Sequence, residues 1–234
     1  MSPSFSFVIP FAPTTAAAAS RFAHALAHRD GTQVLLVGEG RADVPSAPNV
    51  AVLPGLVGKG QGIRAALAQV TGGITVLQDP DSAYSLEACE ALCQPILEDR
   101  ADAVFGQRTP RGLAPALLAE RALGHATRFV TDVTLADPLC GQRAFRTDAL
   151  KSVSLTSDDD AVDAEIVVKL AAQLYRLAEV PVALEAVPHR PLASQLSRLR
   201  TLVRYATVRD DADNQHEGYT TLERMDGEIG RAHV

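Results

Sequence analysis

The chain has 234 residues, of which 47% are hydrophobic and 21% charged, and its formal net charge is -6 at pH 7. This length and composition allow one substantial buried core. The negative charge argues against nucleic acid as a partner and against a general attraction to anionic membranes. No apolar run reaches the roughly 20 residues needed to span a bilayer, and the N-terminus lacks the basic segment of a secretory signal.

Three cysteines are present, and none forms a Cys-x-x-Cys motif. An odd number of unclustered thiols fits a reducing compartment better than a disulfide framework. Cys89 and Cys93 lie four residues apart in an expected helix and are interpreted as small buried apolar residues. We therefore expect a cytoplasmic protein, for which peripheral contact with the inner membrane surface stays open.

In chain order, short apolar runs alternate with helical stretches. The expected strands cover residues 5–10, 33–37, 50–53, 74–77, 103–105 and 177–184. The expected helices cover residues 14–28, 61–70, 85–100, 114–130, 162–176 and 194–208, with a kink or an end at Pro95. Near-continuous apolar strands separated by helices predict an α/β fold with a mostly parallel central sheet flanked by helices. We expect one domain over residues 1–209, followed by a polar C-terminal tail over residues 210–234.

Two aspartates follow the expected strand 74–77 directly, in the segment Gln78-Asp79-Pro80-Asp81. The two-residue period of a strand places Asp79 and Asp81 on the same side, at the edge of the sheet where α/β enzymes bind ligands. Two carboxylates suit Mg²⁺ or Mn²⁺, which completes its coordination with water and substrate phosphate oxygens. A solvated turn is the alternative, but the position after a buried strand favours a metal site and a diphosphate substrate.

Gly58-Lys59-Gly60 precedes the expected helix 61–70. Unpaired backbone N–H groups and the helix dipole would then face an anion, and Lys59 would add a mobile cation. The segment is neither a Walker motif nor a dinucleotide fingerprint. Arg64, one turn further on, can be a ligand or a surface charge.

Several blocks in this order resemble the family 2 glycosyltransferases, and within them the branch of dolichol-phosphate mannosyltransferases and related polyprenyl-phosphate sugar transferases. The blocks are residues 7–10, 58–60, 78–81, 101–108, 136–138 with 141–145, and 177–182. The resemblance implies a GT-A fold with a nucleotide-sugar half over 1–108 and an acceptor half over 109–209. It also implies inverting transfer of a hexosyl group from a UDP- or GDP-sugar to a phosphate or hydroxyl acceptor, with a polyprenyl phosphate among the acceptors.

On the donor side, the resemblance implies roles for residues at the strand ends. Pro10 and Phe11 match the turn under the nucleotide base. Glu39 stands where relatives carry paired aspartates, so the identity of the base stays open. Lys59 and Asp79 match donor-contacting positions, Arg108 can contact the donor or the acceptor phosphate, and Asp79 and Asp81 match the metal ligands.

On the acceptor side, the resemblance implies that Asp137 orients the sugar or accepts a proton. Arg143 can bind the donor or pair structurally with Asp137. Asp163 and Glu165 match the acidic pair that begins the acceptor-side helix and can hold sugar hydroxyls, with Glu165 favoured of the two, although a helix dipole alone also favours acids there. Arg190 matches a phosphate clamp whose lysine is Gln195 in this chain.

Alternatives remain for the surface of one helix and for the function of the protein. The arginines of the expected helix 194–208 fit either a membrane-surface helix or a solvated face over the core. A non-catalytic nucleotide-sugar-binding scaffold would explain the altered acid at Glu39 and the missing clamp lysine. A sugar nucleotidyltransferase is disfavoured because no Gly-rich, Arg-containing loop follows the first strand.

Overall fold

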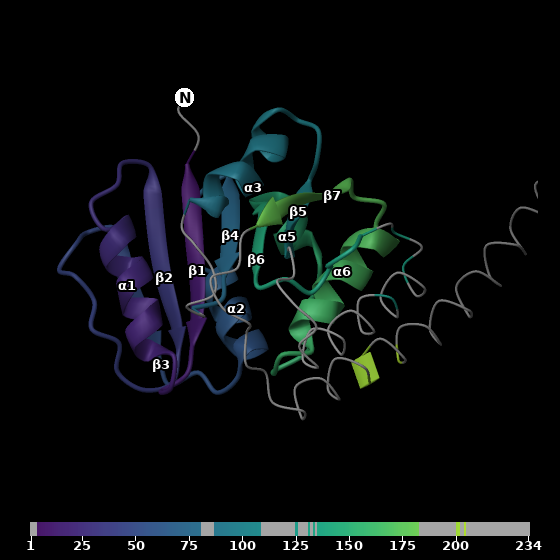
Figure 1. Cartoon of the computed structure of the whole chain (residues 1–234). Coiled ribbons are helices and arrows are strands. Elements are labelled where there is room, and N and C mark those ends of the chain that lie inside the picture. Colours follow the sequence, from purple (N-terminus) through teal and green to yellow (C-terminus); the bar gives the residue numbers. More distant parts are fainter. Residues whose placement is uncertain are drawn as a thin grey trace, which may run out of the picture.

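The structure is a computed structural model that describes residues 4–80, 87–108, 125, 131, 133, 135–182, 200, 201 and 204. In this part of the chain, seven strands form one sheet in the order β3-β2-β1-β4-β6-β5-β7 (Figure 1). The strands are β1 Phe5–Phe11, β2 Thr32–Gly38, β3 Val50–Pro54, β4 Ile74–Gln78, β5 Ala103–Arg108, β6 Gln142–Arg146 and β7 Leu177–Val182.

The described helices follow the strands in a βαβ rhythm. They are α1 Ala16–Leu26, α2 Lys59–Leu67, α3 Ala88–Leu97, α5 Thr147–Ser152 and α6 Val162–Ala172. Pro95 lies inside α3, which ends two residues later. The expected helices 114–130 and 194–208 and the expected tail 210–234 lie outside the described residues, apart from a few isolated positions.

The predicted parallel sheet is confirmed, with one exception. Strands β1, β2, β3 and β4 pair in parallel, as do β5 and β7. Strand β6 lies between β4 and β5 and is antiparallel to both. The carboxyl ends of β1, β2, β4 and β5 therefore meet at one edge of the sheet, together with the beginning of β6.

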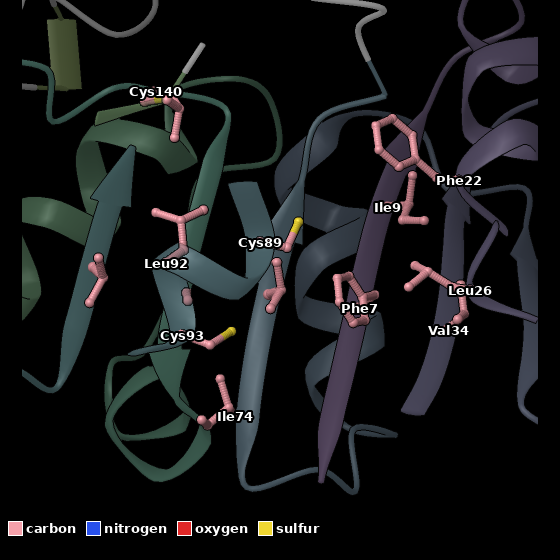
Figure 2. Close-up of a cluster of buried hydrophobic side chains, with 14 of the residues drawn as sticks. Phe7, Ile9, Phe22, Leu26, Val34, Ile74, Cys89, Leu92, Cys93 and Cys140 are labelled. Carbon is pink, nitrogen blue, oxygen red and sulfur yellow. The ribbon is translucent and has the colours of Figure 1, made fainter. Parts of the chain in front are cut away.

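Helices cover both faces of the sheet, because successive strand residues point to opposite sides. Phe7 and Ile9 of β1 pack with α1 and α3 on one face, whereas Val8 packs with α2 and α6 on the other. Figure 2 shows the first of these layers, where the α1 and α3 side chains meet the strands. Cys89 and Cys93 are buried in this layer as free thiols, as predicted, and burial raises the pKa of each to about 12.

Candidate functional site

Asp79 follows the last residue of β4, at the carboxyl edge of the sheet. Its backbone N–H donates to the carbonyl oxygen of Gly141 at 2.9 Å, and the residue is 9% exposed. A Cβ atom at position 141 would lie 2.4 Å from Asp79 Oδ2. Glycine is therefore required at 141 for the carboxylate to keep this place.

The ammonium of Lys59 lies between two aspartates. Its Nζ is 2.6 Å from Asp79 Oδ1 and 2.8 Å from Asp163 Oδ1, and the lysine side chain is 8% exposed. Lys59 begins α2 and Asp163 belongs to the first turn of α6, so three separate elements bring these predicted site residues together. At these distances the ammonium shares two of its three protons with the two carboxylates. One proton remains that can be donated to a bound ligand.

Arg143 of β6 extends this group. Its side chain is fully buried, and its Nη2 donates to Asp163 Oδ1, whereas its Nε and Nη1 have no hydrogen-bond partner among the described residues. Of the two alternatives left open for Arg143, the structural pairing with Asp137 is thus wrong, because Asp137 pairs with Arg108. We call Asp79, Lys59, Asp163 and Arg143 the Asp79 cluster. Its two positive and two negative charges offset one another, as buried charges require.

A second ion pair lies at the end of β5. Arg108 Nη2 donates to Asp137 Oδ1 at 2.6 Å, and the Arg108 backbone N–H donates to Asp137 Oδ2 at 3.1 Å. Glu179 of β7 accepts the backbone N–H groups of Ala136 and Asp137, both at 2.6 Å. Asp137 is therefore held by its backbone and through both carboxylate oxygens.

Asp163 and Glu165 do not act as a pair. Two residues along a helix correspond to a rotation of about 200°, so that Asp163 belongs to the Asp79 cluster, whereas Glu165, which the sequence favoured, points to the preceding loop. Glu165 accepts the N–H groups of Thr156 and Ser157 at 2.8 Å each and pairs with Lys169 at 2.7 Å. Burial raises the pKa of Glu165, but hydrogen bonds from Lys169, Ser157 and Thr156 outweigh it and lower the pKa from 4.5 to about 2.

The start of α2 differs from the expectation of unpaired amides. The N–H groups of Gly60 and Gln61 donate to the carbonyl oxygen of Asp158 at 2.8 and 3.1 Å. Arg64, whose role was open, donates to Ser157 O and Asp158 Oδ1. These two amides are therefore not available to a phosphate, and the cationic contribution of this segment comes from Lys59.

The residues predicted for the nucleotide base lie at the same edge. Pro10 and Phe11 end β1, next to the end of β2, where Glu39 follows Gly38. The N–H of Glu39 donates to Phe11 O at 3.4 Å, whereas the Phe11 side chain is buried in the core. A half-buried Glu39 carboxylate thus borders the turn, and roles in base binding stay predictions for these residues.

Asp81 and Arg190, the second predicted metal ligand and the predicted phosphate clamp, lie outside the described residues. Within the described ranges, no group of three or more His, Cys, Asp or Glu side chains could hold a metal ion. Mg²⁺ commonly takes only one or two protein carboxylates and completes its shell with phosphate oxygens and water. The buried Asp79 carboxylate at the sheet edge, followed two residues later by Asp81, fits that donor chemistry.

Two residues that position the site were missed from the sequence. Glu179 lies in the block 177–182 that carries the resemblance. Nothing in the sequence indicates that its carboxylate accepts hydrogen bonds from the amides of residues 136 and 137. Gly141 precedes β6, a strand that was not expected. Once β6 is known, the pairing of Gln78 with Gln142 places Gly141 beside Asp79 directly.

The sequence matches no protein-family model and no curated protein. Among solved structures, it is similar to glucosyl-3-phosphoglycerate synthase from Mycobacterium tuberculosis in complex with Mn²⁺, UDP and phosphoglyceric acid. The TM-score is 0.68 at 20% identity, over 88% of this chain and 79% of that one. The same synthase with Mg²⁺ and UDP gives a TM-score of 0.67 at 22% identity, over 88% and 80% of the two chains.

A structure described as a mycobacterial protein also matches, with a TM-score of 0.68 at 22% identity, over 88% of this chain and 76% of that one. These similarities establish the fold. The chain has the α/β architecture of GT-A proteins, with a mostly parallel mixed sheet flanked by helices. Membership of the dolichol-phosphate mannosyltransferase branch stays a prediction. In the described residues, no helix has the length and apolar character to cross a membrane.

Proposed function

We propose that the protein is a metal-dependent glycosyltransferase that moves a hexosyl group from a UDP- or GDP-sugar to a phosphate or hydroxyl acceptor, with inversion at the anomeric carbon. The observation that carries the proposal is the buried Asp79 at the end of β4, with the Lys59 ammonium 2.6 Å away, in a GT-A fold. The similar synthase has a structure in complex with Mn²⁺, UDP-glucose and phosphoglyceric acid, which supports a nucleotide-sugar donor here.

Donor binding would use the carboxyl edge of the sheet. Asp79 and Asp81 would hold Mg²⁺ or Mn²⁺, and the cation would supply Lewis-acid stabilisation of the diphosphate. The Lys59 ammonium would donate to a phosphate oxygen the proton that it does not share with Asp79 and Asp163. Pro10, Phe11 and Glu39 would border the base and ribose.

In the reaction, an acceptor oxygen attacks the anomeric carbon as the bond to the diphosphate oxygen breaks. The electron pair of that bond leaves with the nucleoside diphosphate, and Lys59 offsets the charge that develops there. Arg108 and Arg190 are proposed for phosphate contacts on the donor or the acceptor. Arg143 would hold Asp163 in place beside Lys59 through its ion pair.

The ion pairs favour an acceptor that is already ionised. Asp137 and Asp163 are the candidates for removing a proton from a hydroxyl acceptor, yet both oxygens of Asp137 accept from Arg108 and Asp163 binds two cations. A phosphate oxygen needs no proton removed at neutral pH. This reasoning supports a phosphate acceptor, of which a polyprenyl phosphate is one form. The expected contact of residues 194–208 with a membrane stays a prediction.

The test is to incubate the full chain with a panel of UDP- and GDP-sugars, with and without MnCl₂, with polyprenyl phosphate or phosphoglyceric acid as the acceptor. Release of UDP or GDP with sugar transfer supports the proposal. Asp79→Asn should lower the rate by about 10²–10³-fold, whereas the exposed-site control Asp99→Asn should not. Donor binding without turnover for any acceptor would identify a scaffold, and pyrophosphate-dependent formation of a nucleoside triphosphate would identify a nucleotidyltransferase.

A further inference from the structure

The α5–α6 loop, residues 153–161, lies directly against the first turn of α2. The carbonyl oxygen of Asp158 accepts the N–H groups of Gly60 and Gln61. A Cβ atom on Gly60 would lie 2.0 Å from Ser157 O, and one on Gly58, whose φ is +95°, would lie 2.4 Å from Asp158 O. The two glycines thus allow the loop backbone to take the place of a capping side chain at the start of α2.

Arg64 fastens the same loop from α2. Its guanidinium donates to the backbone oxygen of Ser157 and to the side chain of Asp158, more than 90 positions away in the chain. The pair Arg64–Asp158 is partly exposed, so its charge attraction is screened by solvent. The backbone contact to Ser157 adds a constraint on where the loop lies relative to the helix.

Glu165 fastens the loop from the other side. Its carboxylate accepts the N–H and the hydroxyl of Thr156 and the N–H of Ser157, all at 2.8 Å. Lys169 Nζ binds this carboxylate and also donates to Ser154 O. A fully buried carboxylate with this many donors is held in one orientation, and it fixes the loop segment that lies against α2.

Two residues in the first turn of α6 therefore affect the position of the Lys59 ammonium. Asp163 binds the ammonium directly, and Glu165 holds the loop on which the first turn of α2 rests. We propose that Glu165 and Arg64 are positioning residues that act through the α5–α6 loop to keep the Lys59 ammonium between Asp79 and Asp163. The consequence for turnover rests on the proposed function; the placement of Lys59 does not.

The experiment combines three variants with a remote control. Glu165→Ala removes all the carboxylate contacts, Glu165→Gln keeps one carbonyl oxygen, and Arg64→Met removes the contacts from α2. The control is Arg176→Met, which removes an arginine with several hydrogen bonds at the opposite edge of the sheet. In each full-length protein, acetic anhydride labelling of Lys59 and hydrogen exchange of the Gly60 and Gln61 amides are measured by peptide mass spectrometry.

Glu165→Ala removes several hydrogen bonds to a buried carboxylate, so both measurements should increase by at least about tenfold. Arg64→Met removes two partly exposed contacts and should give a smaller increase of about threefold. Glu165→Gln should lie between Glu165→Ala and the wild type. Exchange in β1 should stay near the wild-type rate, because the effect is local. If the wild type transfers sugar, kcat should fall in the same order as Lys59 becomes accessible.

The proposal is overturned if Lys59 labelling and Gly60 exchange in Arg64→Met equal those of the Arg176→Met control. It is also overturned if β1 exchanges faster by the same factor, since that result indicates general destabilisation. Arg64→Met keeps the test decisive should Glu165→Ala fail to fold. A wild type without any transfer activity would refute the proposed function, while labelling and exchange would still decide the positioning role.

Discussion

Two clusters of aspartates and basic residues lie at opposite edges of the sheet, and they differ in burial. The Asp79 cluster lies at the carboxyl ends of the parallel strands and is almost fully buried. The second, which we call the Arg176 cluster, consists of Arg176, Asp99, Asp102 and Arg146 near the amino ends of β5 and β7. Arg176 Nη2 lies 2.8 Å from both Asp99 Oδ1 and Asp102 Oδ1, with its side chain 47% exposed.

Ion pairs between aspartates and basic residues form both clusters, but burial changes how much each charge depends on its partner. In the Arg176 cluster, hydrogen bonds from Arg176 lower the pKa of Asp99 and Asp102, but water and salt screen these exposed pairs. In the Asp79 cluster, each charge depends on its partners because no solvent replaces them. Of these two clusters, only the Asp79 cluster has buried cationic nitrogens without a hydrogen-bond partner among the described residues, namely Nε and Nη1 of Arg143. Buried hydrogen-bond donors without partners therefore distinguish the Asp79 cluster as the candidate site.

The largest difference is expected for matched asparagine substitutions. Asp163→Asn leaves Lys59 and Arg143 buried without their shared anion and should lower the free energy of unfolding by about 3–5 kcal/mol. Asp99→Asn, in the Arg176 cluster, should cost only about 0–1 kcal/mol. Urea unfolding of both variants measures the contrast, and equal losses would show that burial does not distinguish the two clusters.

A smaller effect is expected for a methyl group placed against Asp79. Gly141→Ala puts a Cβ atom 2.4 Å from Asp79 Oδ2, so that the carboxylate must move, at a cost of about 1–3 kcal/mol. Thermal unfolding and Mn²⁺ affinity, measured by calorimetry in the presence of UDP, should both fall. Gly73→Ala is the control, because a Cβ atom there meets nothing within 4 Å; a similar loss in both variants would refute the steric explanation.

The buried carboxylate next to the Asp79 cluster should give acid sensitivity. The pKa of Glu165 is about 2 in the folded chain, against an ordinary value of 4.5. A lowered folded pKa stabilises the protein above pH 4.5, and this stabilisation is lost as the pH falls from 4.5 towards 2. The deficit of Glu165→Gln relative to the wild type should therefore be constant from pH 7 to pH 5.5 and shrink below pH 4.5. Urea unfolding across this range tests it, and a deficit that grows on acidification would contradict the assignment.

The smallest effect is expected at the exposed edge. Arg176→Met removes the centre of the Arg176 cluster but should cost no more than about 1 kcal/mol, and less in 1 M NaCl, where the Debye length is only about 3 Å. Unfolding at low and high salt gives the comparison. A loss that persists unchanged in high salt would mean that Arg176 stabilises by packing and not by charge.

Much of the fold follows from the apolar runs, and the exception has a physical reason. The parallel strands were predicted within a few residues because each is a short apolar segment between helices. Strand β6 reads Gln-Arg-Ala-Phe-Arg, which carries no such signal, since its buried Arg143 is compensated by Asp163 from a distant helix. A polar strand can be central only when tertiary partners exist, and those partners are not visible in a local pattern.

The site could be predicted in its members but not in its pairings. Lys59, Asp79, Arg143 and Asp163 were all expected, and the structure brings them together. Asp137 pairs with Arg108 and Arg143 pairs with Asp163, and these pairings depend on β6 lying between β4 and β5. The pairing of the α2 amides with Asp158 joins segments almost 100 residues apart, so no local signal could reveal that these amides are occupied.

The place of β6 has a consequence for how the chain is made. Strand β5 touches only β6 and β7 in the sheet, and both are synthesised after it. At about 5–20 residues per second on the ribosome, the apolar β5 must wait on the order of seconds before any strand partner emerges. A nascent chain in which β5 has left the ribosome but β6 has not would therefore present an unpaired hydrophobic segment, and a chaperone that covers this segment would prevent its aggregation during the interval.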